Sequence, residues 1–412
     1  MGCQLPLMSR DFMFRNKTEN GMKPFEAKIA ACRNSGDIDT ELTVSKDAAR
    51  FALKQGNHPE VKRFANIACE AYRKKINLLA DYKSSVVVSS LIGKTITEAT
   101  TFSHMYGMAL WTEQFVELKL YNCEKEVSDY LDEGNNYSAA GSAKRAADIA
   151  SKYGMGTKSK VYLSSALKYY DNFISSKVSS KEYDYMLVRG AHLRADVAAR
   201  LVDKRYYEYM NTALGYAKKA ISIANENRDH ILLAEVSVEA AKISRSLGLG
   251  EKYERFMSVA LVQYMKGSES LIRSGKNFMA AQLLDDAADT ARELGKIDTS
   301  KSMLSLSAEC YGREYGEAAL RGDIYQAAIS ARNAAMAYLR LDERDNYCRM
   351  LGNSFNSYEE CVRSDSSPDA SGELLIVAST AAKEIALMLH DSGKVKEMDE
   401  VVRSALSLLR TK

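Results

Sequence analysis

The amino-acid sequence predicts an all-α fold, a right-handed α-solenoid of about eight long helical hairpins. Two observations lead to this prediction. No proline, the residue that most strongly breaks a helix, occurs between Pro59 and Pro368. In addition, Gly134–Ala147, Gly275–Ala288 and Gly322–Ala335 share the pattern G-x-x-[YF]-x-A-A-x5-A-A. A repeated motif in a chain without helix breakers is typical of stacked helical hairpins.

The motif recurs with a fixed period. Its second and third copies begin 47 residues apart, and the first begins 141 residues, or three periods, before the second. Pairs of alanines continue the same step, at Ala146-Ala147, Ala240-Ala241, Ala287-Ala288, Ala334-Ala335 and Ala381-Ala382. The step fails at Leu193-Arg194. A 47-residue unit with one short turn predicts helices of about twenty residues each.

Each residue type in the motif has a packing role. Glycine tolerates a left-handed backbone, so Gly134, Gly275 and Gly322 are predicted to form the turns between helices. Alanines seven residues apart lie on one face of a helix, where small side chains let the next helix approach closely. The aromatic residue three positions after the glycine is expected to anchor the corner against the preceding helix. We expect these residues to define the fold rather than a binding site.

The two ends of the chain are predicted to differ from the repeats. Residues 1–21 lack a helical period and are expected to form a flexible tail, while residues 22–412 form a single solenoid domain. A polar, proline-bearing stretch predicts a loop over residues 364–372. The segments 374–389 and 401–409 then form a C-terminal hairpin that caps the solenoid.

The turn glycine, with alanine five and twelve residues later, resembles the second helix of the tetratricopeptide repeat. The stretch Gly275–Leu341 resembles the longer-helix variant of this repeat in soluble NSF attachment proteins. Those proteins couple helical bundles of membrane-fusion proteins to a ring ATPase through a basic face and an acidic carboxyl terminus. This chain ends in the basic sequence Leu408–Lys412, so the resemblance carries over no functional residue. Since the tetratricopeptide unit has 34 residues, the longer period also admits a HEAT-like or armadillo-like repeat.

Composition argues against several classes of function. A net charge of +3 is too small for a surface that binds nucleic acid mainly through phosphates. The seven cysteines are scattered without a C-x-x-C pair, which favours reduced thiols in the cytoplasm. The sequence has no run of 18 apolar residues, so it predicts no transmembrane helix. The five histidines lack metal-ligand spacing, and Val88 stands where a phosphate loop needs glycine, so we expect no metal, no cofactor and no catalysis.

A stretch rich in tyrosine and basic residues surrounds the failure of the period and is the predicted partner-binding surface. Tyrosine and arginine contribute strongly to protein interfaces. The candidate residues are Tyr169, Tyr170, Arg194, Lys204, Arg205, Tyr206, Tyr207 and Tyr209. The predicted function is that of an adaptor or scaffold, which binds a helix or peptide, for example an acidic helical segment, on its concave face. The first alternative is a regulator that senses a ligand or peptide, and the second is an all-helical enzyme without a recognisable motif.

Overall fold

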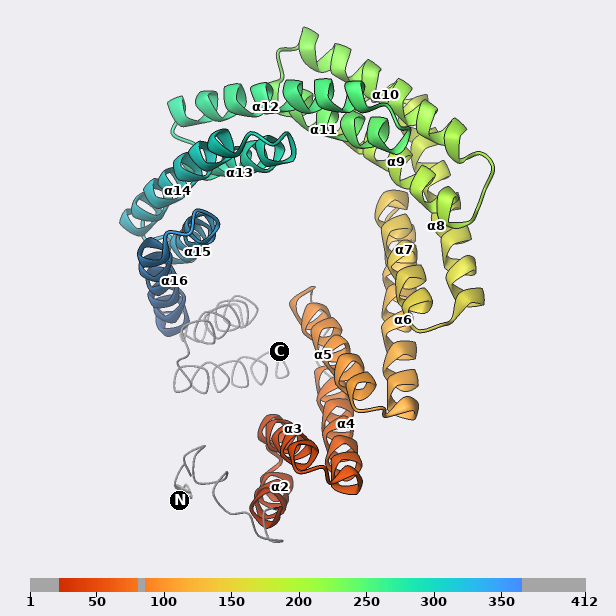
Figure 1. Ribbon diagram of the computed structural model, residues 1–412, viewed down its shortest axis with the longest axis vertical. Coiled ribbons are helices and arrows are strands. Elements are labelled where there is room, and N and C mark those ends of the chain that lie inside the picture. Colours follow the sequence, from red (N-terminus) through yellow and green to blue (C-terminus); the bar gives the residue numbers. More distant parts are fainter. Residues whose placement is uncertain (1–21, 81–85, 365–412) are drawn as a thin grey trace. The chain divides into compact units, whose positions relative to one another are not determined.

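The computed structural model describes residues 22–80 and 86–364, and these residues form fifteen α-helices without a strand (Figure 1). The all-α prediction is therefore confirmed. In chain order the helices are α2 (Lys23–Ser35), α3 (Ile38–Lys54), α4 (His58–Ala80), α5 (Val86–Met105), α6 (Ala109–Asp132), α7 (Asn136–Lys152), α8 (Gly156–Ser179), α9 (Tyr185–Arg200), α10 (Tyr206–Glu226), α11 (His230–Ser246), α12 (Gly250–Arg273), α13 (Asn277–Glu293), α14 (Ile297–Leu320), α15 (Ile324–Arg340) and α16 (Arg344–Ser364). The predicted tail, the capping hairpin and the loop after Ser364 lie outside the described residues.

The chain divides into two compact units, residues 1–122 and 123–412. The sequence predicts one domain over residues 22–412, and the 47-residue period gives no sign of the division. Each unit has its own core. In the first unit Phe64 and Tyr72 are buried, and the second unit has a core built around alanine-rich helices.

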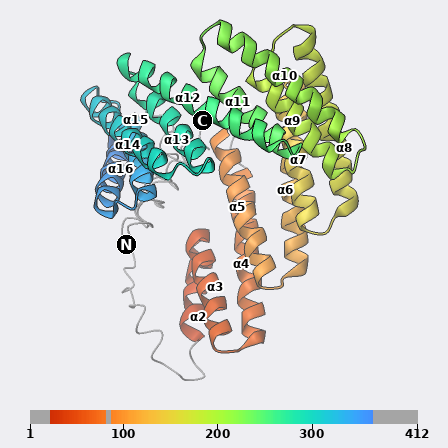
Figure 2. The same cartoon turned by 45° about the horizontal axis from the view of Figure 1, so that its top comes forward.

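Short and long helices alternate in the second unit (Figures 1 and 2). Helices α7, α9, α11, α13 and α15 have 16 or 17 residues, and α8, α10, α12, α14 and α16 have 21 or 24. Each helix from α7 on packs against the next one in the chain. Within this unit the helices follow an arc whose inner side is formed by the short helices. The buried alanines of the motif, such as Ala146 and Ala147, lie where a short helix meets its neighbours.

The turns after the long helices keep the predicted period. A left-handed residue occurs at Gly134, Lys181, Arg228, Gly275 and Gly322, in steps of 47 residues. The turn role predicted for the three glycines is confirmed, and lysine and arginine take the same backbone conformation in the other two turns.

The turns after the short helices explain why the period fails. The left-handed residues are Gly154, Val202, Gly248, Gly295 and Asp342, so the one after α9 comes a residue late. Counted back from this residue, the pair equivalent to Ala146-Ala147 is Arg194-Ala195 instead of Leu193-Arg194. The repeat is thus intact at α9 but shifted by one residue, and an arginine takes the place of its first alanine.

An aromatic pair closes several hairpins. The rings of Tyr137 and Tyr170 meet edge to face with centroids 6.0 Å apart, and Phe278 and Tyr311 meet in the same way at 5.5 Å. In both pairs the motif aromatic, near the start of a short helix, packs against the long helix that follows. The expectation places this ring against the preceding helix; the ring contacts observed here are with the helix that follows.

Candidate functional site

Together, one face of each short helix of the second unit forms what we call the inner strip, whose residues are exposed or half-buried except for buried Glu239. Its positions follow one another at steps of four, three and four residues, so they share the side of each helix opposite the buried alanines. The inner strip consists of Gly141, Arg145, Asp148 and Lys152 on α7; Arg189, Leu193, Asp196 and Arg200 on α9; Glu235, Glu239, Lys242 and Ser246 on α11; Gln282, Asp286, Asp289 and Glu293 on α13; and Ile329, Asn333, Met336 and Arg340 on α15.

Ion pairs join each short helix to the next one along the arc. Arg200 of α9 lies 2.5 Å from Asp148 of α7, measured from Nη1 to Oδ1. Between α11 and α13, Arg245 Nη1 lies 3.9 Å from Glu293 Oε2. Arg340 of α15 pairs with a carboxylate of α13. These contacts fix the strip as one surface rather than a set of independent helices.

The junction between α9 and α11 is the most buried of these contacts. His192 and Glu239 are 9% and 4% exposed, and Nδ1 of the histidine lies 3.0 Å from Oε2 of the glutamate. Lys242 donates to the other oxygen of Glu239 at 3.0 Å, and Asp196 lies 3.8 Å from Nε2 of His192. Burial acts to raise the pKa of Glu239, but the hydrogen bonds from His192 and Lys242 outweigh it and hold this pKa below its usual value.

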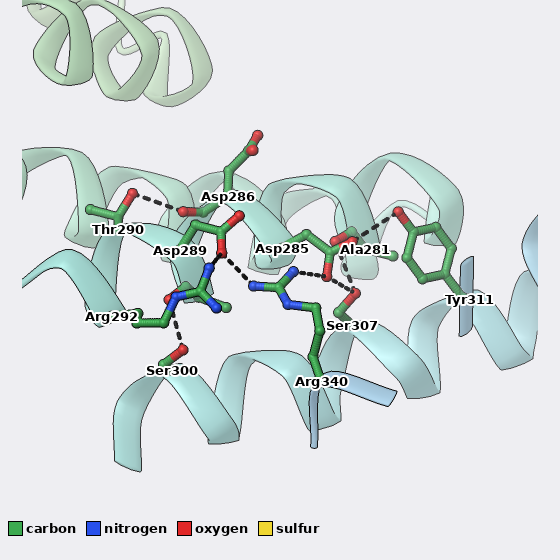
Figure 3. A network of polar contacts seen from close by, with 11 residues as sticks. Ala281, Asp285, Asp286, Asp289, Thr290, Arg292, Ser300, Ser307, Tyr311 and Arg340 are labelled. Atoms are coloured by element: carbon green, nitrogen blue, oxygen red, sulfur yellow. Dashed lines mark hydrogen bonds and ion pairs between the residues drawn. The ribbon is translucent and has the colours of Figure 1, made fainter. Parts of the chain in front are cut away.

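Three carboxylates lie close together on α13 (Figure 3). Asp285 accepts hydrogen bonds from Ser307 Oγ at 2.9 Å and from Tyr311 OH at 3.2 Å. Asp289 pairs with Arg340 and also with Arg292. Both carboxylates are therefore held by groups of the fold itself.

Asp286, the third carboxylate, points away from these partners (Figure 3). Within the described residues it makes no hydrogen bond or ion pair through its side chain. Partial burial, which removes water from the carboxylate, and then the like charges of Asp285 and Asp289 raise the pKa of Asp286 to about 6. Half-buried Glu235 on α11 also lacks an ion pair in the described part of the chain. Burial, followed by the charge of Asp286, raises its pKa as well. The strip thus holds two carboxylates without an ion pair in the described residues, and Arg189 and Lys242 act on them only at longer range.

The structure brings together three of the eight residues predicted to bind a partner. The guanidinium of Arg194 lies over the ring of Tyr209, 4.0 Å from its centroid, and donates to Asp171 at 3.0 Å. Arg205 lies 5.2 Å from the same centroid and binds both oxygens of Asp203, at 3.1 and 2.7 Å. These bases are already paired, so the cluster joins α8, α9 and α10 to one another.

The other five predicted residues do not form one surface with this cluster. Tyr170 is 1% exposed and belongs to the core, while Tyr169 is half-buried against the same core. The rings of Tyr206 and Tyr207 pack edge to face at 5.0 Å, and Tyr207 is 65% exposed. Lys204 is exposed in the turn before α10. The buried position of Tyr170 removes it from any contact surface, and partner binding by the exposed members stays a prediction.

The inner strip was missed in the sequence, although one signal could have revealed it. Its positions recur with the same 47-residue period as the alanines, apart from the one-residue shift at α9. They share no residue type, so a search for repeated letters passes over them.

Other kinds of site have little support in the described residues. A depression of about 480 Å³ on α8 is shallow and open, with Lys160, Ser164 and Lys168 among its lining residues. No group of three histidine, cysteine or acidic side chains in the described ranges could hold a metal ion. None of the helices described is both long enough and apolar enough to span a membrane.

Comparisons with known proteins give only distant similarities. No family model and no curated protein matches the chain. Among solved structures, a circular tandem repeat protein with a novel repeat topology is 13% identical, covers 95% of both chains and has a TM-score of 0.26. BtubC from P. vanneervenii is 14% identical over 60% of this chain and 92% of its own, with a TM-score of 0.29. The apo form of RapI is 10% identical over 95% of this chain and 98% of its own, with a TM-score of 0.26.

Similarities at this level carry no argument about function. The alternation of short and long helices, the periodic turns and the alanine contacts are observations on this chain itself. On that basis the chain is an all-α helical repeat protein.

Proposed function

We propose that this protein is a scaffold whose inner strip holds a helical or extended segment of another protein. The observation that carries the proposal is a contrast between two sets of equivalent positions in the five short helices. One packing position is alanine in every case, at Ala147, Ala195, Ala241, Ala288 and Ala335. The strip position two residues earlier differs in every case, at Arg145, Leu193, Glu239, Asp286 and Asn333.

This contrast separates the requirements of packing from those of the surface. The alanines are almost fully buried, because neighbouring helices approach closely there. The strip position is at least partly exposed in every helix except α11, where Glu239 is buried, and it carries a different side chain on each repeat. Repeat proteins bind extended partners along surfaces of this kind, with each repeat contributing its own contacts.

The proposal gives the chain no catalytic role. Many titratable groups of the strip are held in ion pairs between helices, as Glu239 is with His192 of α9, and this arrangement fixes helices in place. The proposal also locates the partner on the strip, because Arg194 and Arg205 of the predicted surface already bind Asp171 and Asp203. An acidic partner segment finds little free positive charge at those two arginines.

Site-specific photo-crosslinking tests the proposal. A photoreactive amino acid replaces Gln282 of the inner strip in one variant and Val262, exposed on α12, in a matched control. After irradiation in extract of the cells that make the protein, we expect the strip variant to capture a specific protein that the control does not capture. Capture of the same proteins by both variants, or by the α12 control alone, would contradict the proposal.

A further inference from the structure

The charge of the inner strip reverses between α9 and α11, and on α15 its one charged residue is Arg340. On α7 and α9 the strip carries four bases and two acids, and on α11 and α13 it carries one base and five acids. The bases at the first end are Arg145, Lys152, Arg189 and Arg200. The acids at the second end are Glu235, Glu239, Asp286, Asp289 and Glu293. A surface with a basic and an acidic end distinguishes the two directions in which a partner can lie.

Both parts of the strip keep charged side chains that form no ion pair within the described residues. At the basic end, exposed Lys152 lies 5.7 Å from the centroid of the Tyr153 ring, and Arg189 donates to the Tyr185 hydroxyl at 3.1 Å. Neither cation has a carboxylate within ion-pair distance in the described residues. At the other end, Glu235 and Asp286 make no ion pair in the described ranges, although the charges of Arg189 and Lys242 act on them from a longer distance. These four groups are available to a partner.

We propose that the inner strip binds one protein segment whose own charge reverses along its length, with its acidic part over α7 and α9 and its basic part over α11 and α13. This inference rests on the proposed scaffold function and specifies the chemistry of the partner. Three steps between adjacent helices at roughly 10 Å each give a strip of roughly 30 Å. A helix of about twenty residues has the same length.

Electrostatics selects one direction of binding. In the stated direction each unpaired strip charge meets an opposite charge, and a cation beside Asp286 stabilises its ionised form. In the reversed direction the acidic part of the partner lies against Glu235 and Asp286, where like charges repel. The strip therefore determines the orientation of the partner as well as its binding.

Two synthetic peptides of identical composition test this inference. Each has twenty residues on an alanine and leucine background; one has a glutamate-rich half followed by a lysine-rich half, and the other has the reverse order. Each carries a photo-crosslinker at its amino terminus, and fluorescence anisotropy gives the dissociation constant. We expect both peptides to bind, the glutamate-first peptide to crosslink to α7 or α9, and the lysine-first peptide to crosslink to α11 or α13.

A pair of double variants identifies the charges responsible. In Glu235→Gln with Asp286→Asn, we expect the dissociation constant of both peptides to rise at least tenfold at low salt, because two charge pairs with the peptide are lost. The matched control is Glu251→Gln with Glu254→Gln on exposed positions of α12, which removes the same charge and should bind as the wild type does. Circular dichroism confirms that both variants fold.

Three results would overturn the inference. They are crosslinks from both peptides to the same end of the strip, unchanged binding by the Glu235 and Asp286 variant, and absence of binding to the wild type. The scaffold function is judged separately: if Gln282 still captures a cellular protein, only the stated partner chemistry fails.

Discussion

Single residues of the second unit show where packing and surface chemistry conflict. Arg194 occupies a position that is alanine in the equivalent α7, α11, α13 and α15 sites, and its Nε is buried without a hydrogen-bond partner in the described structure. The stacking on Tyr209 and the bond to Asp171 offset part of the desolvation of this guanidinium. Asp286 shows the opposite case, a carboxylate kept near like charges although a neutral side chain would fit.

Asp286 should lower the stability of the protein at neutral pH. Its pKa is about 6 in the folded protein and near 3.8 when unperturbed. Between these values the folded protein keeps a proton that the unfolded chain has lost, so the free energy of unfolding falls as the pH rises from about 4 to about 6. Asp286→Asn removes this charge, so we expect the variant to be more stable than the wild type above pH 6. The gain should be about 1 kcal/mol, since solvent screens this partly exposed group and reduces the effect of the pKa shift.

Urea denaturation at pH 4 and pH 7.5 measures this effect. The stabilisation should be present at pH 7.5 and much smaller at pH 4, where the aspartate is protonated in the folded protein and only partly ionised in the unfolded chain. A gain of the same size at both pH values would show that the charge of Asp286 is not its cause.

At the scale of the helix and turn, the elements most readily predicted are those whose residue types recur. The turn glycines and buried alanines indicate helical hairpins because every repeat has the same steric requirements: glycine allows the left-handed turn, and alanine allows neighbouring helices to approach closely. The shift at α9 could not be predicted, since Val202 takes a left-handed conformation that its side chain disfavours. The inner strip was not predicted, because its equivalent positions, such as Leu193 and Asp286, share no residue type that a search for repeats would detect.

The turn between α9 and α10 should be the easiest element to stabilise. Val202 has φ 58° and is 87% exposed, so its branched side chain strains the backbone and gains little burial. We expect Val202→Gly to raise the free energy of unfolding by about 1 kcal/mol, measured by urea denaturation. Val202→Ala keeps the Cβ atom and should give a smaller gain, while Gly248→Val at the equivalent turn should destabilise. Equal stability of the wild type and Val202→Gly would show that the turn stores no strain.

Over the second unit as a whole, stability should be a sum of local contributions. Packing there is chiefly between helices adjacent in the chain, with α9 and α11 in additional contact, so the unit is close to a one-dimensional array. The ion pairs of the strip are also local: some join neighbouring short helices, and the others lie within one helix or reach the adjacent α6. Distant helices of the strip are therefore not linked by these local ion pairs, and a bound partner that contacts both of them would provide the electrostatic link.

Double variants measure this coupling directly. Val202→Gly and Asp286→Asn affect the α9–α10 turn and α13, which share no partner, so their effects on the free energy of unfolding should add to within about 0.5 kcal/mol. His192→Ala and Glu239→Ala remove the same contact, and the double variant should cost at least about 1 kcal/mol less than the sum of the single ones. If the effects of Val202→Gly and Asp286→Asn on the free energy of unfolding deviate strongly from additivity, the unit unfolds with long-range cooperativity. The repeats would then not contribute independently, either to stability or to the surface that binds a partner.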